Sequence, residues 1–425
     1  MSRTSAADSI PPLVTMDRVL DAQAIFRSPA TIFPLLPVEI IDNVCQRLAM
    51  RDITRVVRAN SVLNAVGTRR LYHTIGAEFF PIRLLRCLIS LDHSKDLPLL
   101  VRTLDINMIN NSPTRGFYVL LERVLKKMVN LTTLVIELPK RHSPTWALPM
   151  PQPALSKSHI FRLRSFTTSM HCKPPLAHFL DSQPEITELT LRGINSDSSN
   201  PLFPFITTLF HSVGALPPDN PLVSSLSPQP SPFALLPTSL PKLSHFNAIH
   251  AGPTIIRDII TARPVTHMSI PLFPPHTMET LSALSLASKP LTRLSVMSFD
   301  PTAPHFLFSE LSARFPELEA LHIVVLMAEV TAPMLLGWGE YLVGFKRLRY
   351  ITFMAALCGD DHVDGEETVK EEIDEKKIAK VWHASCPTLK TIILPQGKVW
   401  FEGTNTDEDE SNGEGDWKCL NWDEE

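Results

Sequence analysis

A six-residue pattern of apolar and other residues recurs over most of the chain. It reads apolar, any, any, apolar, any, apolar, as in LTTLVI (131–136) and VTHMSI (265–270). The fourth residues of neighbouring copies are mostly 22 to 32 residues apart, with candidate helices between them. Such alternation puts the fourth and sixth residues in a core and the fifth on the opposite side. The pattern therefore predicts a repeated unit of strand, turn and helix. Clear copies begin at residues 101, 131, 186, 265, 291 and 318, and looser copies begin at 163, 243, 348 and 389.

A different pattern precedes the repeats. Between residues 36 and 48, apolar residues at i, i+1, i+4 and i+8 from Ile40 form a stripe of helical period, and Pro37 suits a first helical turn. Asp52 is placed to cap a second short helix, and Ser61 to cap a third. Helices this short bury too little surface to be stable alone. Either a partner protein completes their apolar face, or they serve only as the cap of the domain that follows.

The segment 36–75 resembles an F-box. The resemblance rests on the opening L-P-x-E at Leu36, Pro37 and Glu39, on the D-I helix start at Asp52, and on the L-Y pair at Leu71. The segment departs from the family at the third helix, where F-boxes often carry Cys followed by Arg or Lys and then Trp. This chain has Arg-Ala-Asn at residues 58–60. The resemblance covers about a tenth of the chain.

The spacing of the six-residue copies resembles that of leucine-rich repeats, whose units stack to bury a continuous core. The expected fold class is α/β, with a short N-terminal three-helix F-box followed by an irregular leucine-rich-repeat solenoid of parallel strands and outer helices. The alternative is a doubly wound α/β enzyme with ordinary buried strands. The sequence contains no GxGxxG or GxxxxGKS turn, which argues against a nucleotide-binding fold of that kind.

Composition divides the chain further. Proline-rich and acidic stretches interrupt the repeats, and residues 358–425 carry 19 acidic against 7 basic side chains, although the whole chain has a net charge of only −4. The expected organisation is a disordered leader over 1–31, an F-box-like helical motif over 32–78, a solenoid over 79–400 with insertions at 195–241 and 359–375, and an acidic disordered tail over 401–425.

Cysteine usage and hydropathy limit the cellular compartments in which we expect the protein. The six cysteines are scattered without a CxxC pair, as is typical of reduced thiols inside the cell. No apolar run approaches the length of a membrane span, and the first twenty residues lack a secretory apolar core. We therefore expect a cytoplasmic or nuclear protein, or both, with no membrane partner. We also expect no nucleic-acid partner, because a mildly basic body does not by itself indicate nucleic-acid binding.

Catalytic and metal motifs are absent from the sequence. There is no HExxH or GxSxG motif, and the acidic cluster over 360–367 lacks the ligand spacing of an EF-hand. His383 and Cys386 form an isolated pair without further nearby ligands. We expect no enzyme, no cofactor and no metal site, although an α/β enzyme with an unrecognised nucleophile stays open.

The F-box resemblance implies the function. The chain would be the substrate-recognition subunit of an SCF-type ubiquitin ligase, binding the adaptor and through it a cullin, while the solenoid holds a protein substrate. The alternative is a non-catalytic leucine-rich-repeat scaffold without a ubiquitin-ligase role. Expected adaptor-binding residues are Leu36, Pro37, Glu39, Ile40, Ile41, Val44, Leu48, Ile53, Val57 and Leu63. Expected substrate-binding residues are Asn247, Ser269, Ser295, His322, Val324, Thr352, Met354 and Ile393.

The C-terminal end of this expected substrate wall is more apolar than the rest, with Val324, Met354 and Ile393. One hypothesis is that it docks a hydrophobic segment of the target. The other is that the chain's own C-terminal tail covers it.

Overall fold

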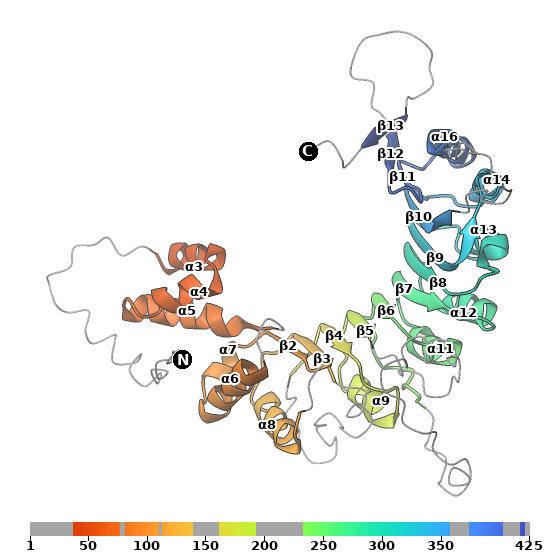
Figure 1. The fold of residues 1–425 in the computed structure, drawn as a ribbon. Helices are drawn as coiled ribbons and strands as arrows, with labels where there is room; N and C mark the ends of the chain where they lie inside the picture. Colours follow the sequence, from red (N-terminus) through yellow and green to blue (C-terminus); the bar gives the residue numbers. More distant parts are fainter. Residues whose placement is uncertain are drawn as a thin grey trace, which may run out of the picture. The chain divides into compact units, whose positions relative to one another are not determined.

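The computed structural model describes residues 37–76, 81–109, 113–138, 161–192, 233–357, 374–402 and 417–420 (Figure 1). The chain divides into two compact units. Unit 1 comprises Met1–Val135 and Pro151–Leu163, and unit 2 comprises Ile136–Met150 and Arg164–Glu425. The expected leader, and Leu36 at the start of the F-box-like motif, lie outside the described residues.

Three short helices come first in unit 1, as the apolar spacing predicts. They are α3 (Val38–Arg47), α4 (Met50–Val56) and α5 (Ser61–His73). The expected cap at Asp52 is wrong, because α4 begins at Met50 with Ala49 at its N-cap. The expected cap at Ser61 is also displaced by one residue. Asn60 caps α5, since its side-chain Oδ1 accepts the backbone N–H of Leu63 at 2.8 Å.

Helices α4 and α5 approach most closely at Gly67. A Cβ atom at this position would lie 2.4 Å from Cγ1 of Val57 and 3.5 Å from Cγ2 of Ile53. Ile53 is buried here together with Cys45 and Val66. The three helices thus have a small interior of their own, and only glycine lets α5 pack this close to α4.

The remainder of unit 1 alternates strands and helices. The elements are β1 (Thr74–Ile75), α6 (Pro81–His93), α7 (Leu97–Leu100), β2 (Thr103–Asn107) and α8 (Arg115–Leu125), followed by β3 (Thr133–Glu137), which begins in unit 1 and ends in unit 2. β1 pairs with β2 in parallel. Helix α8 buries Phe117, Leu121 and Val124, which recur at helical spacing, so one apolar stripe explains how it packs.

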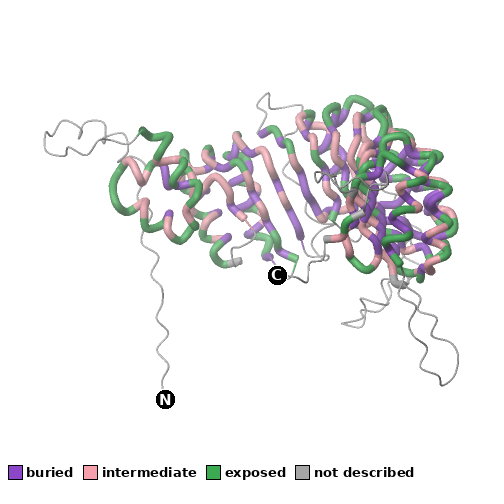
Figure 2. The backbone as a smooth tube through the Cα atoms, turned by 90° about the horizontal axis from the view of Figure 1, so that it is seen from above, coloured by how far each residue is buried: buried purple, intermediate pink, exposed green. Residues whose placement is uncertain are grey.

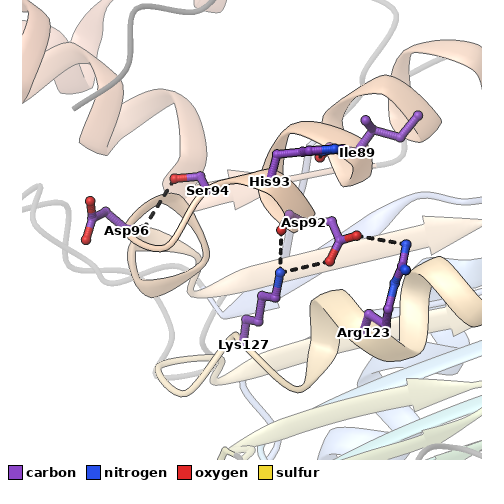
Figure 3. Close-up of polar contacts among 7 residues, drawn as sticks. All are labelled: Ile89, Asp92, His93, Ser94, Asp96, Arg123 and Lys127. Carbon is purple, nitrogen blue, oxygen red and sulfur yellow. Dashed lines mark hydrogen bonds and ion pairs between the residues drawn. The ribbon is translucent and has the colours of Figure 1, made fainter. Parts of the chain in front are cut away.

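An ion-pair network joins α6 to α8 (Figure 3). The Asp92 carboxylate lies 2.8 Å from a guanidinium nitrogen of Arg123 and 2.8 Å from Nζ of Lys127, and this Nζ also donates to the Asp92 backbone carbonyl. The hydrogen bond from Lys127 and the charges of both cations hold the pKa of Asp92 below its ordinary value. Asp92 and Lys127 are 35 residues apart in the sequence. The network therefore holds the C-terminal ends of α6 and α8 next to each other.

Unit 2 is built on strands that pair in chain order. Each strand from β4 to β11 is parallel to the next. Two further strands, β12 and β13, continue the sheet in antiparallel fashion. The strands are β4 (Ser165–Thr168), β5 (Glu188–Leu191), β6 (His245–Ala248), β7 (His267–Leu272), β8 (Arg293–Ser298), β9 (Ala320–Val330), β10 (Tyr350–Leu357), β11 (Thr391–Ile393), β12 (Val399–Glu402) and β13 (Trp417–Leu420).

Helices cover one face of this sheet (Figure 1). They are α9 (Pro174–Asp181), α11 (Pro253–Ile260), α12 (Thr277–Leu284), α13 (Ala303–Arg314), α14 (Ala332–Gly337), α15 (Gly339–Leu342) and α16 (Glu375–Ser385). Buried positions concentrate in the sheet and on the inward sides of these helices (Figure 2). Within the described part of unit 2, no helix lies on the other face, which we call the open face.

The strand order decides between the two topologies that the sequence left open. In unit 2 the order from β4 to β13 follows the chain without reversal. A doubly wound sheet reverses direction at a switch point, and its ligand site lies there. The described strands therefore form a mostly parallel α/β sheet compatible with a solenoid, in which each unit packs on its chain neighbours.

A series of hydroxyl groups marks the position just before several strands. Thr187 donates to the carbonyl of Arg164, Ser244 to that of Thr187, Thr266 to that of Ser244, and Thr292 to that of Thr266, over 3.1 to 3.4 Å. These residues occupy the second position of the six-residue pattern. We call this series the hydroxyl ladder, because each member bonds to the equivalent residue of the preceding copy.

Two expected boundaries need correction. Residues 417–420 of the expected disordered tail form β13, which pairs with β12, and Phe401 and Glu402 belong to β12 itself. The expected insertion at 195–241 ends early, because residues 233–241 pack on the fold. There the Arg263 guanidinium donates to the carbonyls of Leu236 and Ser239 at 3.0 and 2.9 Å. Backbone carbonyls satisfied by a buried cation have no signature in composition.

The acidic insertion also ends inside the fold. Asp374 caps α16 through its Oδ1, which accepts the N–H of Lys377 at 3.0 Å. Glu375 is only 2% exposed and lies within the expected insertion at 359–375. Its carboxylate accepts the backbone N–H of Gln396 at 2.8 Å and Nε1–H of Trp400 at 3.3 Å. An acidic residue that reads as solvated in the sequence therefore joins α16 to β12.

Candidate functional site

Exposed apolar side chains gather on the first helices of unit 1. Val38, Ile40 and Val44 of α3 are 54%, 46% and 53% exposed, and Met50 at the start of α4 is 40% exposed. We call these four residues the helical patch. Ile40 and Val44 are four residues apart and share one side of α3, whereas Val38 lies seven residues before the buried Cys45, on the side of that residue. Exposed apolar side chains on a small helical unit are candidates for contact with another molecule.

The structure separates the expected adaptor-binding residues by exposure. Pro37, Glu39, Ile40 and Val44 are exposed, while Ile41, Leu48, Val57 and Leu63 are half-buried. Ile53 is 1% exposed in the interior between α4 and α5, so the expectation that it contacts a partner is wrong. Helical spacing alone cannot say which of two apolar faces turns inward. The same ambiguity hid Val38 and Met50, which the sequence analysis did not select.

Cys45 occupies the inner side of α3. It is 1% exposed, and burial followed by the nearby charge of Asp42 raises the pKa of its thiol. A protonated buried thiol is a poor nucleophile. The other side of α3 carries Ile40 and Val44 of the helical patch.

The expected substrate-binding residues lie on the open face of unit 2. Strand pairing puts the fifth residues of successive copies in register, so that they form one row across six neighbouring strands. Ser295 Oγ and His322 Nδ1 are 3.0 Å apart in this row. We call it the middle row, and it consists of Asn247, Ser269, Ser295, His322, Thr352 and Ile393.

A second row precedes the middle row by two residues along each strand. Its first three members, His245, His267 and Arg293, are in register on β6, β7 and β8, and we call them the basic row. The imidazole rings of His245 and His267 are stacked, with centroids 4.2 Å apart and planes inclined by 25°. Ala320 and Tyr350 continue the row on β9 and β10.

Hydroxyl groups of the ladder orient the two histidines. Ser244 Oγ lies 2.9 Å from Nδ1 of His245, and Thr266 Oγ1 lies 2.9 Å from Nδ1 of His267. Burial, His245 and Arg293 lower the pKa of His267, against the opposing effect of Glu319. Burial also lowers the pKa of His322. Both imidazoles therefore favour the neutral form near neutral pH in the unliganded protein.

The two rows border a shallow open depression of about 350 Å³. Among the residues that the structure describes, its lining contains no carboxylate: the side chains are His245, Asn247, His267, Met268, Arg293, Leu294, Ser295, Ala320, Leu321, His322, Tyr350 and Thr352. Carboxylates lie at its margins, with Glu188 continuing the row on β5 and Glu319 immediately before β9. The depression offers ring nitrogens, hydroxyls and one guanidinium to a bound molecule.

A third row follows the middle row by two residues. Met297 is in register with Pro271 on one side and Val324 on the other, and Val324 with Met354. Met297 is 44% exposed, and Val324 and Met354 are half-buried. We call these four residues the apolar row. Val324 and Met354 were expected substrate contacts, whereas Met297 and Pro271 were not.

Ile393 is the one expected substrate contact at the far end of the sheet. It pairs with Val399 of β12, so it lies beside a further strand. The described part of the C-terminal tail, β13, extends the sheet beyond β12 by strand pairing. These four residues of the tail therefore form the next strand and do not cross the open face.

Sequence reasoning missed the basic row although the signal was present. His245, His267 and Arg293 are third residues of their six-residue copies, and third and fifth residues of a strand share a face. The selection took the fifth residues and, at the C-terminal end only, Val324 and Met354 two residues further on. Extending it by two positions in each direction identifies both the basic row and Met297.

The described residues contain no group of three or more His, Cys, Asp or Glu side chains placed to hold a metal ion. Within the same ranges, no helix combines the length and apolar character needed to cross a bilayer. Neither a protein-family model nor a curated protein matches the chain. The geometry of the helical patch and of the open face is thus the basis for any functional assignment.

Proposed function

We propose that the chain is the substrate-recognition subunit of an SCF-type ubiquitin ligase. Helices α3 to α5 bind the adaptor, which connects the chain to a cullin, and the open face of unit 2 holds a protein substrate. The chain itself performs no chemistry in this proposal, and it works in the cytoplasm, the nucleus or both. The observation that carries the proposal is the helical patch, because it lies within the segment that resembles an F-box.

The physical argument concerns the cost of leaving the patch in water. Val38, Ile40 and Val44 lie on one short helix and are about half exposed. Burial of such side chains contributes about 25 cal/mol for each Å² removed from water. Glu39 in the first turn of α3 also favours the helix, since a carboxylate there opposes the macrodipole. A helical partner surface that covers the patch stabilises both proteins.

A second candidate function has one observation in its favour. The third helix departs from the F-box pattern at Arg58, Ala59 and Asn60, and Asn60 serves as a helix cap. In this alternative the chain is a non-catalytic leucine-rich-repeat scaffold whose helical segment only caps the repeats. Adaptor binding distinguishes the two functions.

The test is co-expression with the SCF adaptor, followed by size-exclusion chromatography of the full chain. We expect a stoichiometric complex with the wild type and its loss with the double variant Ile40→Asp, Val44→Asp, because two charges cannot be buried at an apolar interface. Val119→Asp is the matched control, since Val119 on α8 is 48% exposed and lies outside the patch. A folded wild-type chain that elutes apart from the adaptor would support the scaffold function.

A further inference from the structure

The open face changes character from one edge to the other. On β8 alone, Arg293, Ser295 and Met297 point to this face, giving a cation, a small hydroxyl and a thioether in succession. On β7 the equivalent positions are His267, Ser269 and Pro271, of which Pro271 is buried, so the exposed part of the apolar row begins at Met297. The basic row therefore runs along one side of the middle row, and the apolar row runs along the other.

The distances between the rows suit an α-helix. Arg293 and Met297 are four residues apart on an extended strand, which separates them by about 13 Å. A helix with its side chains is about 10 to 12 Å across, so one lying along the middle row reaches both outer rows. Small side chains such as Ser269 and Ser295 in the middle row allow a backbone to approach closely.

The charge of the basic row determines which side chains a bound helix would place against it. Within the described residues, the Arg293 guanidinium forms no ion pair with a carboxylate, although it is exposed. The stacked imidazoles of His245 and His267 beside it add ring nitrogens that donate hydrogen bonds to an anion when they carry a proton. The positively charged part of the open face is limited to β6, β7 and β8, because Glu188 lies on β5 and Glu319 lies just before β9. Arg349 before β10 is the next cation along the same edge.

We propose that the open face of unit 2 binds an amphipathic helix of a partner protein, with acidic residues against the basic row and apolar residues against the apolar row. This inference rests on the proposed function, because it specifies the class of substrate segment held by the same face. The five strands β6 to β10 span about 19 Å, which corresponds to about 13 residues of helix.

The test is an unbiased selection of random peptides of about 16 residues, displayed as a library and panned against the full-length protein. We expect the recovered peptides to carry acidic residues on one side of a helical repeat and apolar residues on another, at spacings of three and four residues. Selection against Arg293→Glu should exchange the acidic residues for basic ones. This reversal of preference cannot arise from a variant that merely fails to fold.

The remaining arms use one recovered peptide and fluorescence anisotropy. Met297→Ser should weaken its binding by about tenfold, as expected for loss of about 1.4 kcal/mol of apolar contact. Arg257→Glu is the matched control, because it makes the same charge change on helix α11, and it should leave the affinity unchanged. An unchanged preference with Arg293→Glu, a spacing of two residues, or the recovery of no peptide overturns the inference.

The adaptor experiment is independent of this result. A wild-type preparation that forms the adaptor complex but selects no such peptide would overturn only the inference. A preparation that selects the peptides but ignores the adaptor would overturn the proposed ligase role and leave the inference in place for a scaffold.

Discussion

Gly67 is the residue on which the packing of α4 and α5 depends most directly. Alanine at this position would put a Cβ atom 2.4 Å from Cγ1 of Val57, closer than carbon atoms approach in folded proteins. Relief of this overlap requires the Val57 side chain or α5 to shift, and such overpacking costs about 1 to 3 kcal/mol of the free energy of unfolding. We therefore expect Gly67→Ala to lower the urea midpoint and to weaken adaptor binding together.

Gly76→Ala is the control for this prediction. Gly76 lies just after β1, where an added Cβ would meet nothing within 4 Å, so its replacement should leave both measurements unchanged. Equal urea midpoints for Gly67→Ala and the wild type would contradict the packing argument. The sequence could not identify Gly67, because a glycine within a helix is also compatible with a simple loss of helix propensity.

At the scale of elements, Glu375 connects helix α16 to strand β12. The fully buried carboxylate holds the N–H groups of Gln396 and Trp400, and burial raises its pKa despite these two hydrogen bonds. Glu375→Ala leaves both donors without this acceptor, so we expect a loss of about 1 to 3 kcal/mol of stability. Faster hydrogen exchange over 396–402 and 417–420 would locate the loss in β12 and β13.

Glu340→Ala on helix α15 is the matched control for Glu375→Ala. Glu340 is exposed in the first turn of its helix, so its removal should cost only a few tenths of a kcal/mol through the helix dipole. A Glu375→Ala variant with wild-type exchange over the two strands would show that the carboxylate does not hold them.

The elements also set the limit of what the sequence could predict. The alternation of Leu294 and Val296 with Ser295 identified strand β8, because one face of the sheet is buried and the other is not. The same reasoning failed for Trp417–Leu420, where a strand of four residues is held by pairing with β12 inside an acidic stretch. A strand of four residues leaves too little periodicity to detect.

In the candidate sites too, the sequence predicted some residues correctly and misplaced others. The middle row was predictable, since the register of parallel strands preserves the position within each copy. Ile53 was assigned to the wrong side of its helix, because the inward face of α4 depends on where α5 crosses it. The hydrophobic periodicity of one segment does not predict its contacts with a segment that is distant in the sequence.

At the scale of the whole molecule, three histidines make the stability depend on pH. Burial lowers the pKa of His73, His267 and His322 in the folded chain. As the pH falls below the ordinary histidine pKa of about 6.5, the unfolded chain therefore binds more protons at these three residues than the folded chain does. The stabilising contribution is therefore complete above that pKa and is lost as the pH falls through the window between the unfolded and folded values.

We expect the melting temperature to fall as the pH is lowered from about 7.5 to about 5.5, and to fall less when His73, His267 and His322 are replaced by glutamine. Differential scanning calorimetry measures both profiles. Glu375 opposes the trend, because its raised pKa favours the folded state as the pH falls through that pKa. A triple variant with the same acid sensitivity as the wild type would exclude the three histidines as its source.

The hydroxyl ladder has a consequence for how the sequence of this protein can evolve. Ser244 bonds to Thr187 across an interval of 57 residues, while Thr266 bonds to Ser244 across an interval of 22. The same local bond thus aligns successive strands whatever length of chain lies between them. Insertions and deletions between copies can accumulate without shifting which side chains reach the open face. Loop length and binding specificity are thereby free to evolve separately.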